Sequence, residues 1–154
     1  MSNLNIKITD FGFACFFNPQ EGLMDVLGSP LYMAPEIIQE KKYDHRVDVW
    51  STGVIAYILL SGRPPFKGRT KADIFNSIIN HPLQFDHPIW DKISPEAKNF
   101  LKMALEKDYH KRATAKQLIE HEWLKKSIKE SDVRKDVDIG VKNNIEQFRK
   151  TTVF

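Results

Sequence analysis

The chain has 154 residues, of which 42% are hydrophobic and 28% are charged, a composition typical of one soluble globular domain. Its net charge of +3 is too small to indicate nucleic-acid binding, because acidic residues are interleaved with the basic ones. The single cysteine, Cys15, excludes a disulfide within the chain and favours a reducing compartment, so we expect the protein in the cytoplasm or the nucleus. We expect neither a signal peptide nor a histidine metal site.

The first expected element is a short strand at residues 6–9, where apolar and polar side chains alternate ahead of Asp10-Phe11-Gly12. The residues before this stretch are too few to form a hairpin partner for it. We therefore expect the chain to begin in the middle of a structural unit.

Residues 13–28 follow no helical or strand pattern and contain glycine and proline turn signals, which predicts a long surface loop. Loops of this length in compact domains are usually functional. This one contains no serine, threonine or tyrosine, so hydroxyl phosphorylation cannot switch it. Its Glu21 and Asp25 are either substitutes for a phosphate group or ordinary solvated acids, and both interpretations stay open.

The most apolar stretch runs from Val47 to Leu60 and leaves no polar stripe at any helical phase, so as a helix it must be enclosed on nearly every side. It is too short to cross a bilayer and contains Asp48 and Ser51, which favours a buried central helix over a membrane span. Gly62 is the expected C-cap, and Pro64-Pro65 ends the helix.

Four shorter helices are expected, each beginning with a first-turn proline or a capping serine or threonine. Their expected starts are Ala34-Pro35-Glu36, Thr70 with Asp73, Ser94 with Pro95, and Thr114 with Gln117. The last of these is expected to continue to about Leu124.

The chain becomes strongly charged from about Lys125, which indicates a linker. Beyond it, Val141, Ile145 and Phe148 recur at helical spacing beside Arg149, which predicts a short basic amphipathic helix.

Two motifs bracket residues 10–36. Asp-Phe-Gly and Ala-Pro-Glu, in this order, are the limits of a protein-kinase activation segment. With them the chain resembles the C-terminal lobe portion of a eukaryotic serine/threonine protein kinase. Residues 48–66, 93–98 and 121–124 are similar to the calcium-dependent and calcium/calmodulin-regulated branch of that family.

The resemblance implies a mainly α fold: the helical large lobe of the α+β kinase fold, with a short strand before Asp-Phe-Gly. Residues 1–126 are expected to be a partial kinase domain without the N-terminal lobe and the catalytic loop. Residues 127–154 are expected to be a charged linker and a basic segment similar to the junction that follows the kinase domain in this family.

ATP and Mg²⁺ are the cofactors that the resemblance implies for the intact protein. Asp10 would hold the magnesium ion, since a hard cation prefers carboxylate oxygen. Thr9, Phe11 and Gly12 would line or shape the nucleotide site. The catalytic base is expected upstream of Met1, so we expect this chain alone neither to bind ATP tightly nor to transfer phosphate.

A protein substrate is the expected partner. The resemblance implies that five residues of this chain form a shelf, which binds the substrate residue that follows the phosphorylated serine or threonine. The shelf residues are Gly28, Ser29, Pro30, Leu31 and Tyr32. Ser29 marks the serine/threonine class. Pro30 is unusual at its position and removes a backbone donor.

Structural roles are implied for a second group, which comprises Glu36, Asp48, Trp50, Gly53 and Arg112. In the family, Glu36 would pair with Arg112, and Asp48 would accept hydrogen bonds from the backbone of the catalytic loop.

Regulation is expected in the C-terminal segment, through Ile145, Phe148 and Arg149. In the family that the chain resembles, this helix would plug the substrate groove. It would be removed when a calcium-loaded EF-hand sensor binds it. The chain itself contains no EF-hand loop.

Three hypotheses remain open at this point. The chain is part of a serine/threonine kinase, a short non-catalytic module that binds proteins, or a remnant without a stable fold. The second is disfavoured because Asp48, without the catalytic loop, would be an unmatched buried charge beside uncovered apolar surface.

Overall fold

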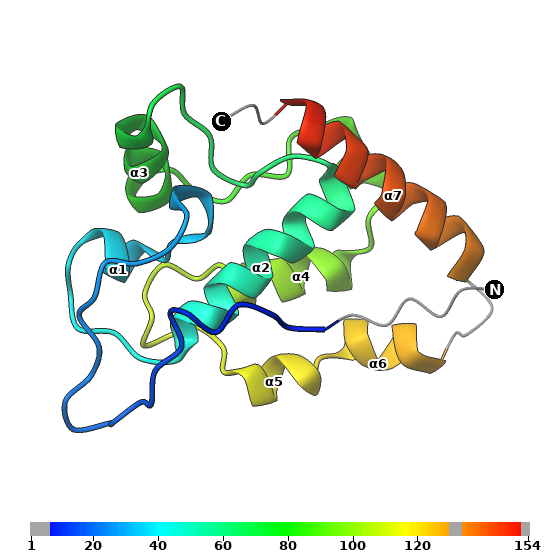
Figure 1. Ribbon diagram of the computed structural model, residues 1–154. Helices are drawn as coiled ribbons and strands as arrows, with labels where there is room; N and C mark the ends of the chain where they lie inside the picture. Colours follow the sequence, from blue (N-terminus) through cyan, green and yellow to red (C-terminus); the bar gives the residue numbers. More distant parts are fainter. Residues whose placement is uncertain (1–6, 130–133, 152–154) are drawn as a thin grey trace.

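Helix α2, Arg46–Ser61, crosses the middle of the structure, and the other helices are arranged around it (Figure 1). The structure is a computed structural model that describes residues 7–129 and 134–151. Its other elements are η1 (Pro30–Tyr32), α1 (Pro35–Ile38), α3 (Lys71–Asn80), η2 (Pro88–Lys92), α4 (Pro95–Ala104), α5 (Ala115–Ile119), α6 (Glu122–Lys129) and α7 (Arg134–Thr151). The prediction of a mainly α fold is confirmed.

The core is built on the buried side of α2. The Trp50 ring is fully buried, stacks on Phe66 with the ring centroids 5.6 Å apart, and carries the guanidinium carbon of Arg112 at 5.0 Å from its centroid. One turn further on, a Cβ at Gly53 would lie 2.8 Å from the Cβ of Ala104 in α4. Because real Cβ atoms do not approach so closely, a glycine is what lets α2 and α4 pack at this distance.

The ends of α2 follow the sequence signals. Gly62 adopts a left-handed conformation with φ of 69°, and its N–H donates to the carbonyl of Ile58 at 2.7 Å. A residue with a side chain pays a strain penalty in this conformation, which explains the glycine at the C-cap.

One face of α2 differs from the expectation of an enclosed helix. Asp48, Thr52 and Ile55 follow one another at helical spacing and are all exposed, with Ile55 49% exposed. The carboxylate of Asp48 is therefore not a buried charge, because the part of the chain that the structure describes does not cover this side of the helix. The stripe leaves one face of the N-terminal half of α2 open to solvent.

The predicted capping boxes are confirmed. The backbone N–H of Asp73 donates to the Thr70 hydroxyl at 3.1 Å, and the N–H of Thr70 donates to the Asp73 carboxylate at 3.0 Å. These hydrogen bonds from Thr70 hold the pKa of Asp73 below its usual value. Thr114 and Gln117 form the same reciprocal pair at the start of α5.

The helix from Thr114 is shorter than predicted. It ends at Ile119, and α6 begins at Glu122 after a turn. His121 makes this break, because its Nδ1 accepts the backbone N–H of Trp123 at 3.1 Å and so caps a new helix. Of the expected linker, 127–129 continue α6, α7 begins at Arg134, and 130–133 lie outside the described residues.

The strand expected before Asp-Phe-Gly is not formed at residues 7–9, while Ile6 lies outside the described residues. Within residues 7–129 and 134–151, β pairing is limited to one antiparallel bridge between Leu23 and Tyr43, with both N···O distances 3.0 Å. An alternating pattern specifies a strand only when a partner strand satisfies its backbone groups, and none is described here.

Candidate functional site

Glu36 and Arg112 form a buried ion pair that fixes the end of the residue 10–36 segment to the helical core. Both residues are 2% exposed. The two guanidinium NH groups of Arg112 donate to the two carboxylate oxygens of Glu36 at 2.6 and 2.8 Å. Such a fork-to-fork arrangement is the geometry in which arginine binds a carboxylate most strongly.

The remaining donors of Arg112 are also used. Its Nε donates to the carbonyl of Glu106 at 2.8 Å, and an NH group donates to the carbonyl of Arg46 at 3.1 Å. One side chain therefore joins the start of α1, the start of α2 and the loop after α4. Because every polar group of the pair is satisfied, its burial is tolerated, and loss of one partner would leave a buried unpaired charge.

Arg46 is a structural residue that the sequence interpretation missed. Its guanidinium donates to the carbonyl of Tyr109 at 2.6 Å and lies 3.5 Å from the carboxylate of Asp44. The available signal was the close spacing of Asp44 and Arg46 directly before the predicted helix. Nothing in the sequence indicated Tyr109, because only its backbone carbonyl takes part.

The shelf residues form a short rigid turn. Gly28 has a φ of 114°, Ser29 precedes η1, and the N–H of Tyr32 donates to the carbonyl of Ser29 at 3.0 Å. Pro30 occupies the first position of η1, where a missing N–H costs nothing. Its presence is thus compatible with a regular shelf.

The shelf is attached to α2 through its backbone. The hydroxyl of Ser51 donates to the carbonyl of Tyr32 at 2.9 Å, and Leu31 is buried beneath the turn. Burial also raises the pKa of the Tyr32 hydroxyl, so this group stays protonated and neutral at physiological pH.

Asp10 and its neighbours are exposed in the structure. Asp10 has a φ of 62°, and one of its carboxylate oxygens accepts the N–H of Gly12 at 3.3 Å. Phe11 is 69% exposed, and Thr9 is exposed as well. The residues that the resemblance assigns to the nucleotide therefore lie at the surface.

A complete nucleotide site is not assembled by these residues. Within residues 7–129 and 134–151 no group of three histidine, cysteine or acidic residues is positioned to hold a metal ion. Asp10 can offer one carboxylate to magnesium, but the described residues around it provide no further metal ligand and no cradle for phosphates. The fit to ATP and Mg²⁺ is thus limited to a single ligand.

Helix α7 packs on the C-terminal end of α2, away from α1 (Figure 1). The side-chain amide of Asn144 donates to the carbonyl of Leu59 at 2.8 Å, and Phe148 packs against the core. A Cβ at Gly62 would lie 3.2 Å from the carbonyl oxygen of Asn144, so a close approach to α7 is a second reason for glycine there.

The contact face of α7 differs from the predicted stripe. Ile145 is 40% exposed and Arg149 is exposed, while Val141, Asn144 and Phe148 are half-buried. The expectation that α7 plugs the substrate groove stays a prediction, while the main described contacts of α7 are with α2. The physical reason for the different contact face is that Asn144 satisfies a free carbonyl in the last turn of α2, which a purely apolar stripe does not predict.

Comparisons with known proteins agree with this architecture. The family model for the protein kinase domain matches residues 1–124, so the chain belongs to the protein kinase domain family. It is 44% identical over 136 residues to a CDPK-related protein kinase of Daucus carota, a match that covers 88% of this chain and 22% of that protein.

Other relatives carry calcium-dependent kinase names. Calcium-dependent protein kinase 17 of Arabidopsis thaliana is 39% identical, with 99% of this chain and 28% of that protein covered. Calcium-dependent protein kinase 2 of Zea mays is also 39% identical, with 96% of this chain and 28% of that protein covered. The predicted resemblance to this branch is confirmed, and the chain spans about a quarter of the length of these relatives.

In the described helices, no segment combines the length and the apolar character that a transmembrane span requires.

Proposed function

We propose that this chain supplies the helical large-lobe part of a calcium-regulated protein serine/threonine kinase, which transfers phosphate from ATP to protein hydroxyl groups. The observation that carries the proposal is the buried fork between Glu36 and Arg112, which ties the segment from Asp10 to Glu36 to α2. Membership of the protein kinase domain family supports the same assignment.

The roles of individual residues follow from their chemistry and position. Asp10 supplies a carboxylate to the magnesium ion that accompanies ATP, since it is exposed and makes only a local hydrogen bond to Gly12. The shelf, Gly28–Tyr32, receives the protein substrate next to its serine or threonine. Activity requires a glycine-rich loop and a catalytic aspartate and asparagine, which this sequence does not contain.

The names of the relatives also support calcium regulation. We propose that α7 is the regulatory element, with an EF-hand sensor as its partner and the exposed Ile145 and Arg149 as contact residues. The half-buried face of α7, by contrast, holds it on α2. We place the protein in the cytoplasm or the nucleus, on the basis of its single free cysteine.

A non-catalytic interaction module is the second candidate. It is favoured by the exposed Asp48, because the charge is compatible with solvent and needs no catalytic loop to satisfy it. The two candidates differ in whether the chain can serve in phosphoryl transfer at all.

The test supplies the sequence elements that phosphoryl transfer requires. The part of the carrot CDPK-related protein kinase that precedes its match is joined to this chain, and incorporation of labelled phosphate into a generic serine/threonine substrate is measured. We expect magnesium-dependent phosphorylation by the fusion protein and none by the 154-residue chain alone. A folded fusion protein without activity, or activity of the chain by itself, would contradict the proposal.

A further inference from the structure

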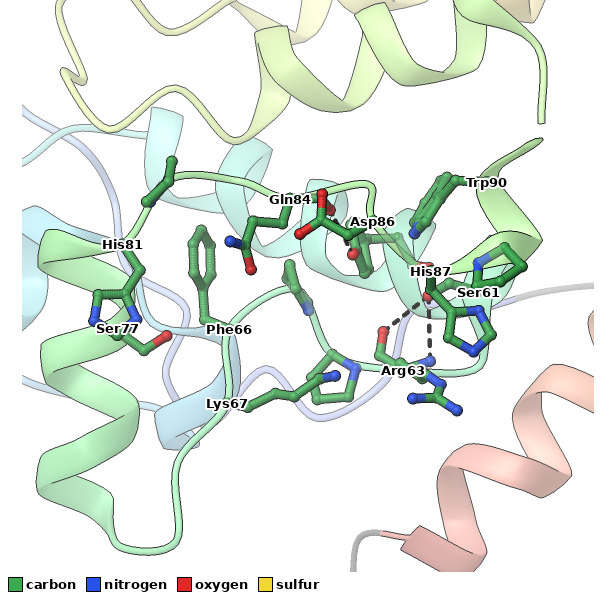
Figure 2. Close-up of a pocket in the computed structure, with 15 residues that line it drawn as sticks. Ser61, Arg63, Phe66, Lys67, Ser77, His81, Gln84, Asp86, His87 and Trp90 are labelled. Atoms are coloured by element: carbon green, nitrogen blue, oxygen red, sulfur yellow. Dashed lines mark hydrogen bonds between the residues drawn. The ribbon is translucent and has the colours of Figure 1, made fainter. Parts of the chain in front are cut away.

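A pocket lies between the C-terminal end of α2, the loop after it, the end of α3 and the segment before η2 (Figure 2). Its volume of about 430 Å³ is within the range of sites that bind small molecules or a few peptide side chains. None of its lining residues belongs to the shelf or to the Asp10–Gly12 turn. The pocket is thus separate from the site described above.

The walls of the pocket are preformed. Four of the lining residues are prolines, which are Pro64, Pro65, Pro82 and Pro88. The hydroxyl of Tyr57 donates a hydrogen bond to the carbonyl of Gln84 at 2.8 Å. The ring centroids of Tyr57 and Trp90 lie 4.6 Å apart. Fixed proline backbone and packed aromatic rings lower the ordering cost of binding a ligand.

Positive charge gathers on one side of this pocket. Figure 2 shows Arg63 and Lys67 along the lower side, with Asp86 on the opposite side. Within the described part of the chain, neither cation forms an ion pair, and the Nε of Arg63 is buried without a hydrogen-bond partner. Two cations without a described counter-charge favour a ligand that brings a carboxylate.

A third cation adds to the positive field from behind the pocket wall. The ammonium group of Lys107 lies 5.3 Å from the ring centroid of Phe66 and donates to the carbonyl groups of Ile79 and His81. Burial lowers the pKa of Lys107, and the nearby Glu106 opposes this shift. Its hydrogen bonds are already made, so it contributes charge to the pocket and no contact.

We propose that this pocket is a docking site for an acidic peptide segment of a partner protein, with a carboxylate on Arg63 and Lys67 and a neighbouring apolar side chain between the prolines. The planar guanidinium of Arg63 matches a carboxylate in shape and charge, and the ammonium group of Lys67 adds a second positive charge. A small free anion satisfies the cations but leaves the apolar walls uncovered, whereas an acidic peptide with an apolar residue covers both.

The first measurement uses the 154-residue chain and fluorescence anisotropy. The probe is a fluorescein-labelled peptide of sequence Gly-Glu-Glu-Leu-Glu-Gly, and the matched control peptide has glutamine in place of each glutamate. We expect the acidic peptide to bind about tenfold more tightly or better, with affinity falling as salt is raised. Equal affinity of the two peptides would overturn the proposal. This test needs no phosphoryl transfer, so its outcome is independent of the proposed function.

Variants locate the binding. Arg63→Gln and Lys67→Gln are each expected to weaken the acidic peptide about tenfold. Lys67 is exposed, so its variant also serves if Arg63→Gln impairs folding. Arg69→Gln is the matched control, because Arg69 is exposed in the same loop, does not line the pocket and keeps its backbone hydrogen bond to Asp73. We expect no change for it.

Three outcomes would reject the site. If Arg69→Gln weakens the peptide as much as Lys67→Gln does, the attraction is a general surface charge effect. If inorganic phosphate displaces the peptide at concentrations close to the dissociation constant of the peptide, the pocket is an anion site and not a peptide site. Retained binding in both pocket variants would also contradict the assignment.

Discussion

Glu36→Gln is expected to lower the free energy of unfolding of the chain by about 3 to 5 kcal/mol. The substitution keeps the size of the side chain but removes the negative charge that compensates Arg112 in a fully buried position. The guanidinium of Arg112 is then left buried without a counter-charge. The measurement is urea unfolding followed by circular dichroism.

The matched control is Glu120→Gln. Glu120 also forms an ion pair, with Lys125 at 2.5 Å, but both side chains of that pair are largely exposed. Surface pairs contribute little, so the unfolding midpoint should hardly change. If Glu36→Gln were no more destabilising than Glu120→Gln, the buried pair would not be the anchor that we describe.

A double variant separates loss of charge from loss of volume. In Glu36→Leu with Arg112→Met, both charges are removed together and apolar side chains fill the space. Since neither partner is left unpaired, we expect this double variant to be more stable than Glu36→Gln alone. The stability of this double variant is obtained from the same unfolding measurement.

Asp10→Asn in the fusion protein is expected to reduce phosphorylation by about a hundredfold or more. A neutral amide oxygen is a much weaker ligand for a hard divalent cation than a carboxylate. The thermal unfolding of the variant should be unchanged, because Asp10 is exposed and its described contact is one hydrogen bond of 3.3 Å from Gly12.

Asp25→Asn is the control for this loss of activity. Asp25 is an exposed acid in the same segment, and its described hydrogen bond uses the backbone carbonyl, which accepts the Tyr43 hydroxyl at 2.8 Å. Its substitution should leave phosphorylation unaffected if Asp25 is an ordinary solvated acid, whereas a loss of activity would indicate that it substitutes for a phosphate group. Retention of more than about a tenth of the activity in Asp10→Asn would show that the carboxylate is not a magnesium ligand.

Local signals in the sequence were enough to predict most helix boundaries. The capping boxes at Thr70 and Thr114 and the glycine after Ser61 act within a few residues of themselves. Such features depend on backbone groups that any helix must satisfy, so they can be read without the tertiary structure.

Features that depend on a partner could not be read in this way. The strand predicted at residues 6–9 has no partner among the described residues, and the open side of α2 at Ile55 has no described segment over it. The contact of Asn144 with Leu59 joins segments far apart in the chain. In each case the sequence pattern indicates only the structure that one segment prefers. Whether that structure forms, or is covered, depends on the segments that pack against it.

The candidate site divides along the same line. The ion pair between Glu36 and Arg112 was predicted from the resemblance to the kinase family. No local sequence pattern indicates a contact between residues so far apart in the chain. The pocket at Arg63 and Lys67 had no sequence signal, because its walls come from two stretches, 57–67 and 77–90, that meet only in the fold.

Dye binding tests the central claim that the open apolar face of this chain belongs to an interface within a larger kinase. Phe11, Phe13 and Phe16 are exposed, and so is Ile55 on α2. The fluorescence of 1-anilinonaphthalene-8-sulfonate, measured on the chain and on the fusion protein, reports such surface directly. We predict strong dye fluorescence with the chain alone and its loss in the fusion protein. An isolated chain that is monomeric and leaves the dye dark would contradict the account.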